Sequence, residues 1–169
     1  MEKLNKVERA ILANQFRILA FLDETNGAHL NKKAEIAEYG YEGLYGELLD
    51  HIYDGVDNAT CDETFDILTM FRAIQNTISG LTDEEKETID LDMLKFQGFD
   101  ANNDKHYGFM EFLVEKEGRY KGIANLYRNS HSISTIRIYR GLLGVYRERI
   151  RHQTGPLTLE DLQEMCRPT

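Results

Sequence analysis

The sequence predicts an all-α protein, and three observations support this. Apolar residues recur at spacings of three and four along several segments, which is the period of an amphipathic helix. Proline is nearly absent, with only Pro156 and Pro168, so nothing breaks a helix before the C-terminal part of the chain. Before three of the segments, a threonine is followed three residues later by an acidic residue, which is typical of a helix start. We expect one compact domain of about eight helices over residues 1–169, without a significant sheet.

The N-terminal third predicts three helices. The first spans about residues 4–22, and the segment 23–27 supplies turn residues after it. A second helix over about 28–38 should end near Gly40, because glycine readily takes a left-handed backbone. A third is expected from about Tyr41 to Tyr53. The apolar face of the first helix consists of Leu4, Val7, Ile11, Ile18 and Leu22, interrupted by Asn14 and widened by Leu12, Phe16 and Leu19.

The middle of the chain predicts three more helices. Thr60 and Glu63 have the spacing of a capping box and should begin a helix that ends at Gly80. Thr82 and Glu85 repeat this pattern and open an acidic first turn, which suits the positive end of a helix dipole. Another helix is expected over 101–117, ending at Gly118. The segment 119–131 carries no clear prediction.

The C-terminal part predicts a long helix and a short one. The long helix should begin at Ser132 or Ser134, since the 3.6-residue period is sustained over about 17 residues despite a strand-like start. Thr158 and Asp161 should cap the short terminal helix after a turn at residues 155–156. The long helix is marked by Ile136, Tyr139, Leu143, Tyr146 and Ile150.

Charge is unevenly distributed. The formal net charge is −9, which disfavours non-specific nucleic-acid binding. Residues 116–152 nevertheless contain nine Lys/Arg and only two Asp/Glu. Within them, a stripe of arginines lies beside the apolar face of the long helix and is a candidate binding surface. It can meet the acidic remainder of the chain, contact another subunit, or bind phosphate or nucleic acid. The stripe consists of Arg137, Arg140, Arg147 and Arg151.

The chain shows no membrane span, signal peptide or metal motif. No apolar run approaches the ~20 residues that a bilayer requires, and the N-terminus is charged from the start, so we expect a cytoplasmic protein without a membrane partner. Cys61 and Cys166 are far apart and should be reduced. Neither cysteine nor histidine spacing suggests zinc, and we expect no cofactor.

One segment resembles a calcium-binding EF-hand loop. Asp100, Asn102, Asp104 and Glu111 stand at positions 1, 3, 5 and 12 of such a loop. However, Lys105 occupies the position where the sharp turn requires glycine, and it adds a positive charge beside the cation site. We therefore expect no metal here, and favour a polar helix start.

No catalytic motif is present, since the chain lacks a P-loop, a G-x-S-x-G elbow and an H-E-x-x-H pair. An enzyme site assembled from separate helices is the alternative, with Glu117, Arg119, Tyr120 and His106 as candidates. Several tyrosines near the third helix could line a pocket, although filling a core is the favoured interpretation. They are Tyr39, Tyr41, Tyr45 and Tyr53.

Two stretches together resemble the YfbU family of bacterial proteins. One is Glu8 to Phe16, running on to Leu22-Asp23; the other is Phe96 to Asp100, with Tyr107, Phe112, Val114 and the run Glu117 to Tyr120. The resemblance implies an all-helical, cytoplasmic, self-associating domain without established enzyme activity or agreed catalytic residues. In some members this domain is joined to a helix-turn-helix, which implies a ligand-binding or regulatory role.

Taken together, we expect a non-enzymatic homo-oligomer that binds a small molecule or a protein partner. Glu117, Arg119, Tyr120 and the arginine stripe are the candidate binding residues. An enzyme, and a nucleic-acid-associated protein using the stripe, are the alternatives, although nucleic acid is not the expected partner.

Overall fold

The computed structural model describes residues 3–50, 52–53, 55–123, 128–129, 135–152 and 155–167. It is all-α, as the sequence predicts. The chain divides into two compact units, residues 1–55 and 56–169, and each is described by itself. The prediction of one domain over residues 1–169 stays a prediction. No helix in the described ranges is long and apolar enough to cross a membrane.

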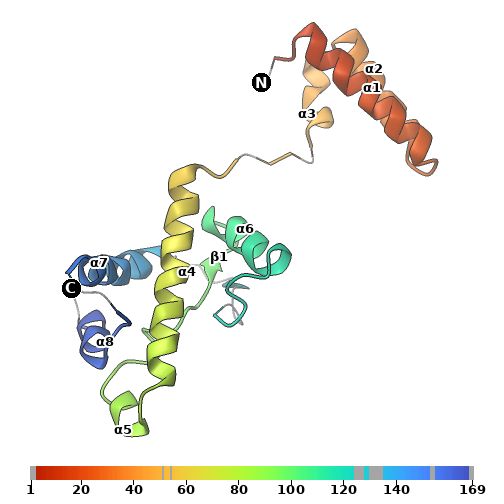
Figure 1. The fold of residues 1–169 in the computed structure, drawn as a ribbon. Coiled ribbons are helices and arrows are strands. Elements are labelled where there is room, and N and C mark those ends of the chain that lie inside the picture. Colours follow the sequence, from red (N-terminus) through yellow and green to blue (C-terminus); the bar gives the residue numbers. More distant parts are fainter. Residues whose placement is uncertain are drawn as a thin grey trace. The chain divides into compact units, whose positions relative to one another are not determined.

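Unit 1 is a helical hairpin followed by two short turns of helix (Figure 1). Helix α1, Lys6–Leu22, begins with a capping box between Asn5 and Glu8, and α2, Gly27–Tyr39, lies beside it. As predicted, α2 ends at Gly40, whose φ of 73° is left-handed. The predicted helix over 41–53 is wrong in extent, since only a 3-10 turn, Glu42–Leu44, and α3, Tyr45–Leu48, form. Gly43 and Gly46 disfavour a continuous helix there.

The core of unit 1 is small. Side chains of all three helices contribute, and Leu4, Leu12, Phe16 and Leu49 pack against its edge. Most of the apolar residues that predict α1 lie outside this core. Leu12 and Phe16, which widen that face, pack against the core instead. The buried residues are Ala13, Ile36, Ala37, Tyr45 and Leu48.

Unit 2 is arranged around α4, Asn58–Ser79, with α7, Ile136–His152, and α8, Leu159–Met165, toward one side and α6, His106–Glu111, toward the other (Figure 1). The short α5, Asp83–Lys86, follows α4. Its core is rich in aromatic rings: Phe71, Phe96, Phe99 and Tyr139 lie with centroids 5.0–5.8 Å apart. Burial raises the pKa of Tyr139 to about 12.

The predicted caps of unit 2 are largely confirmed. Thr82 and Glu85 form a capping box at α5, and Thr158 and Asp161 form one at α8. The predicted pair of Thr60 and Glu63 is wrong, because Asp57 caps α4 by accepting a hydrogen bond from the Thr60 amide at 2.8 Å. The Glu63 side chain is thereby left to make other contacts.

The remaining elements are short. In place of the predicted helix over 101–117, α6 continues into a π-helical segment, Phe112–Lys116. The predicted end at Gly118 is confirmed, with a left-handed φ of 68°. Two strands, β1 at Phe99–Asp100 and β2 at Arg128–Asn129, pair in parallel. The predicted starts of the long helix, Ser132 and Ser134, lie outside the described residues.

Candidate functional site

The arginine stripe of α7 faces carboxylates of α4. Arg140 forms a bidentate salt bridge with Glu63, with Nε–Oε1 at 2.8 Å and Nη2–Oε2 at 2.9 Å. One turn further along α4, Asp66 pairs with Arg147. The hydrogen bonds from Arg140 hold the pKa of Glu63 at about 2, outweighing the partial burial that would raise it. Two of the four predicted stripe residues are therefore paired with the acidic face of α4.

Glu63 also contacts a buried histidine. His106 Nε2 lies 2.8 Å from Glu63 Oε2, and the imidazole stacks on Phe99 at 5.2 Å. The other ring nitrogen, Nδ1, is buried and has no hydrogen-bond partner among the residues that the structure describes. Because Glu63 is shared between His106 and Arg140, this cluster ties α4, α6 and α7 together.

The C-terminal end of α7 carries a second set of ion pairs. Arg151 and His152 contact Glu148 at 3.2 and 2.9 Å. Arg149, which the predicted stripe omits, lies mostly buried and contacts Asp161 of α8 at 2.9 Å. Partial burial raises the pKa of Asp161, but hydrogen bonds from Thr158 and Arg149 together lower it by more. The pKa of Asp161 therefore lies below its ordinary value. In the sequence, the capping box of Thr158 and Asp161 was the feature that could have indicated a fixed position for the Asp161 carboxylate.

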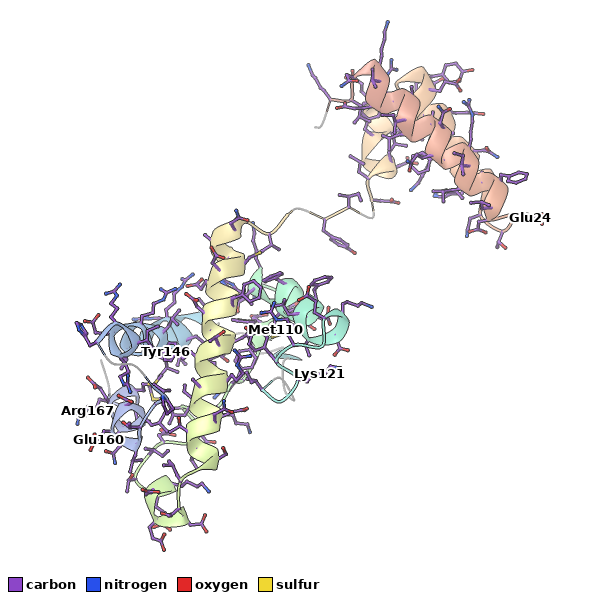
Figure 2. All side chains as sticks on the ribbon, in the orientation of Figure 1. Glu24, Met110, Lys121, Tyr146, Glu160 and Arg167 are labelled. Atoms are coloured by element: carbon purple, nitrogen blue, oxygen red, sulfur yellow. The ribbon has the colours of Figure 1, made fainter. Side chains whose placement is uncertain are left out.

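Arg137, the remaining stripe residue, lies at a pocket between α7 and α8. The pocket has a volume of about 290 Å³, and Arg167, just beyond the end of α8 (Figure 2), provides its second cation. The rest of the lining is apolar or glycine. We call it the basic pocket; its lining residues are Met93, Arg137, Ile138, Gly141, Leu142, Val145, Met165 and Arg167.

A second pocket on the same two helices has the opposite charge. Its volume is about 470 Å³, and Val145 lines both pockets. We call it the acidic pocket; it is lined by Gly144, Val145, Glu148, Arg149, His152, Asp161 and Glu164.

Gly141 and Gly144 keep the surface of α7 open at the two pockets. Glycine inside a helix is about 1 kcal/mol less favourable than alanine. At neither position would an added Cβ meet an atom within 4 Å, so close packing does not require glycine there. The two glycines thus cost helix stability and leave space above the basic and the acidic pocket.

Glu117, Arg119 and Tyr120 form a separate cluster that packs against α4. The Tyr120 hydroxyl lies 3.1 Å from Thr69 Oγ1, and the Arg119 guanidinium lies over the Phe65 ring at 4.8 Å. Glu117 is 3.5 Å from Arg119. Tyr120 is buried and has a φ of 58°, a left-handed backbone that is unusual outside glycine. This cluster fastens the turn after the π-helical segment to α4.

The enzyme candidates do not converge on one point. Glu63, which holds His106, and Thr69, which contacts Tyr120, are six residues apart on α4. That separation corresponds to roughly 9 Å along the axis and to different sides of the helix.

The loop that resembles an EF-hand is closed by its own hydrogen bonds. Asp100 is buried, and its two oxygens accept from the Asn102 amide and the Asn103 side chain, each at 2.8 Å. These hydrogen bonds lower the pKa of Asp100, and the bond from the Asn103 side chain has the largest effect. Asp104 accepts from the Asp100 amide, and Glu111 from the Tyr107 hydroxyl. Within the described ranges, no group of three or more His, Cys, Asp or Glu could hold a metal.

The tyrosines of unit 1 do not share one environment. Tyr45 is buried in the core, as the favoured interpretation requires. Tyr39 and Tyr41 are exposed and stack on each other at 5.8 Å, and Tyr53 is also exposed. Core packing is therefore confirmed for Tyr45 and wrong for the other three.

The structure defines an all-α protein with two pockets on the surface of its C-terminal helices. The YfbU domain model matches residues 1–167, so the chain belongs to the YfbU family, and the predicted resemblance is confirmed. The relatives include the UPF0304 protein MJECS11 of Methanocaldococcus jannaschii. It is 30% identical over 133 residues, which cover 78% of each chain. The family has no characterised function.

Proposed function

We propose that this chain is a non-enzymatic, homo-oligomeric binding module that takes a small organic anion in its basic pocket. One observation carries the ligand part. Arg137 and Arg167 have no ion-pair partner in the described parts of the chain, whereas Arg140, Arg147, Arg149 and Arg151 all contact carboxylates. A carboxylate or phosphate on a ligand would supply the missing negative charge.

The rest of the lining favours a ligand with an apolar part. Met93, Leu142, Val145 and Met165 contribute hydrophobic surface, and methionine adapts to irregular shapes. A volume of about 290 Å³ is at the small end of ligand sites. The pocket therefore suits a short aliphatic or aromatic acid.

The alternative functions have less support. Nucleic-acid binding would need Arg140 and Arg147 to leave Glu63 and Asp66, at the cost of two ion pairs. An enzyme would need catalytic groups that share a cleft. The candidates are instead divided between two clusters that contact different sides of α4. The cytoplasmic location belongs to this proposal as a prediction from the sequence.

Thermal shift and calorimetry with hexanoate, benzoate and inorganic phosphate test the ligand part. We expect hexanoate to stabilise the full chain more than hexanol does, because only the acid can pair with Arg137. At 100 times its Kd, a ligand stabilises by about 2.7 kcal/mol.

Two variants, each with a matched control, locate the site. Arg137→Ala should abolish the effect, whereas Arg151→Ala, on the same helix but paired with Glu148, should retain it. Gly141→Leu should fill the basic pocket without straining the backbone, and Gly144→Leu is the matched control in the acidic pocket. If none of the three probes binds, or if Arg137→Ala binds as well as the wild type, the ligand part is wrong.

A further inference from the structure

Helix α1 is apolar on two opposite faces, but unit 1 covers only one of them. Ala13 is buried, and Leu12 and Phe16 pack against the same core. Nothing within unit 1 covers the large side chains of the other face. The exposed residues, with their exposed fractions, are Val7 (67%), Ile11 (53%), Ile18 (60%), Phe21 (85%) and Leu22 (72%).

The spacing of this exposed face is that of a coiled-coil seam. Val7, Ile11, Asn14, Ile18 and Phe21 follow one another at steps of four, three, four and three, which are the a and d positions of a heptad repeat. The only polar residue of the series is asparagine, and a single asparagine in a seam fixes the register of the paired helices. The face therefore suits another helix with a matching stripe.

We propose that α1 pairs with α1 of a second copy of this chain, antiparallel and centred on Asn14. Asn14 is the midpoint of α1, Lys6–Leu22. Val7 and Phe21 are equally far from it on either side, so an antiparallel pair places the small Val7 against the large Phe21 of the other copy. Ile11 is three residues before Asn14 and Ile18 is four after it, so these two approach each other with an offset of one residue. The stripe is thus complementary to itself, as a two-fold interface requires.

The charges at the two ends of α1 favour the antiparallel direction. Lys3 and Lys6 are exposed near its start, and Asp23 and Glu24 are exposed just after its end, where Figure 2 labels Glu24. Antiparallel pairing brings the basic end of one helix to the acidic end of the other, and it opposes the two helix dipoles. Parallel pairing would bring like charges together.

Oligomeric state in solution tests the surface, which rests on the homo-oligomer part of the proposed function. Light scattering of the full chain across about 1–100 μM should show a dimer. Ile11→Glu and Ile18→Glu should each raise the dimer dissociation constant by about tenfold or more, because each places a charge in an apolar seam. Ile150→Glu, at an equally exposed isoleucine of α7 (50%), should leave it unchanged. Circular dichroism checks that all variants remain helical.

The outcomes separate this inference from the proposed function. A wild-type chain that is monomeric at about 100 μM overturns both the α1 pairing and the homo-oligomer. A dimer that both glutamate variants leave intact overturns the α1 surface alone. Neither result affects the basic pocket, whose test depends on Arg137.

Cysteine cross-linking tests the direction. Single variants Val7→Cys and Phe21→Cys, each with Cys61 and Cys166 replaced by alanine, are mixed and oxidised. Antiparallel pairing should link Val7→Cys chains to Phe21→Cys chains, because a disulfide needs Cα atoms within about 7 Å. If each variant instead links only to itself, the antiparallel arrangement is wrong.

Discussion

The two units differ in how fully they bury their own apolar residues. Unit 2 encloses a cluster of rings around Phe71 and Tyr139, each of which is at most 2% exposed. Unit 1, in its described part, has a core of only five buried residues, two of them alanines, and leaves Phe21 and Ile18 uncovered by its own side chains. A segment of about 55 residues can fold alone, but its stability is marginal because so small a unit buries a limited share of its surface. The comparison indicates that unit 2 is stabilised from within, whereas unit 1 does not cover one apolar face of its own first helix.

The largest expected effect contrasts a phenylalanine from each unit. Phe71→Ala should lower the unfolding free energy of unit 2 by about 3–5 kcal/mol, because it leaves a cavity in a closed core. Phe21→Ala should change stability by about 0.5 kcal/mol or less when the protein is dilute enough to be monomeric. Urea denaturation followed by circular dichroism measures both. Equal losses for the two variants would mean that Phe21 is buried within its own chain.

A smaller effect concerns the ion pairs within unit 2. Glu63→Gln should destabilise the protein by about 3 kcal/mol at pH 7, because Glu63 has a native pKa of about 2 against an ordinary 4.5. A lowered pKa stabilises the fold above about pH 4.5, and this contribution is lost as the pH falls toward 2. The difference between wild type and variant should therefore shrink between pH 7 and pH 3.

Denaturation at several pH values measures this difference. Glu87→Gln, at an exposed glutamate next to α5, is the control and should show a smaller change. A gap that stays constant from pH 7 to pH 3 would contradict the assignment of the stabilisation to the charged Glu63.

The smallest expected effect concerns the glycine that ends α2 in unit 1. Gly40→Ala should cost about 1–2 kcal/mol, because a left-handed backbone is unfavourable for alanine. Its Cβ would also collide with the Arg9 guanidinium unless that side chain moves. Gly43→Ala, where an added Cβ meets nothing within 4 Å, should be nearly neutral. The helical signal of unit 1 during thermal unfolding measures both. A neutral Gly40→Ala would contradict the requirement for glycine at the end of α2.

Local signals in the sequence predicted the helices and many of their ends. The capping boxes at Thr82 and Thr158, and the glycines at 40 and 118, depend on residues a few positions away, so the structure confirms them. Thr60 and Glu63 were mispredicted because Asp57 is a competing cap and Arg140, 77 residues away, engages the glutamate. A short-range pattern cannot include such a distant partner.

The candidate sites were less predictable for the same reason. Arg137 was singled out with its stripe, but its difference from Arg140 and Arg147 depends on carboxylates of α4. Arg149 was missed because it lies off the stripe, and its partner Asp161 belongs to another helix. The basic pocket combines residues from three separate segments, among them Met93 and Met165.

The sequence by itself determined the helical class, the family and the residues that share a helix face, because helical periodicity and capping are local properties. It also predicted one wide apolar face on α1, which the structure divides into two stripes on opposite sides of the helix. Only the tertiary structure decided which stripe is buried, which arginines of α7 are neutralised, and that Arg137 lies at a pocket. These outcomes depend on contacts between distant residues, such as the 81 positions that separate Asp66 from Arg147. Periodicity identifies a face, whereas burial depends on what packs against it.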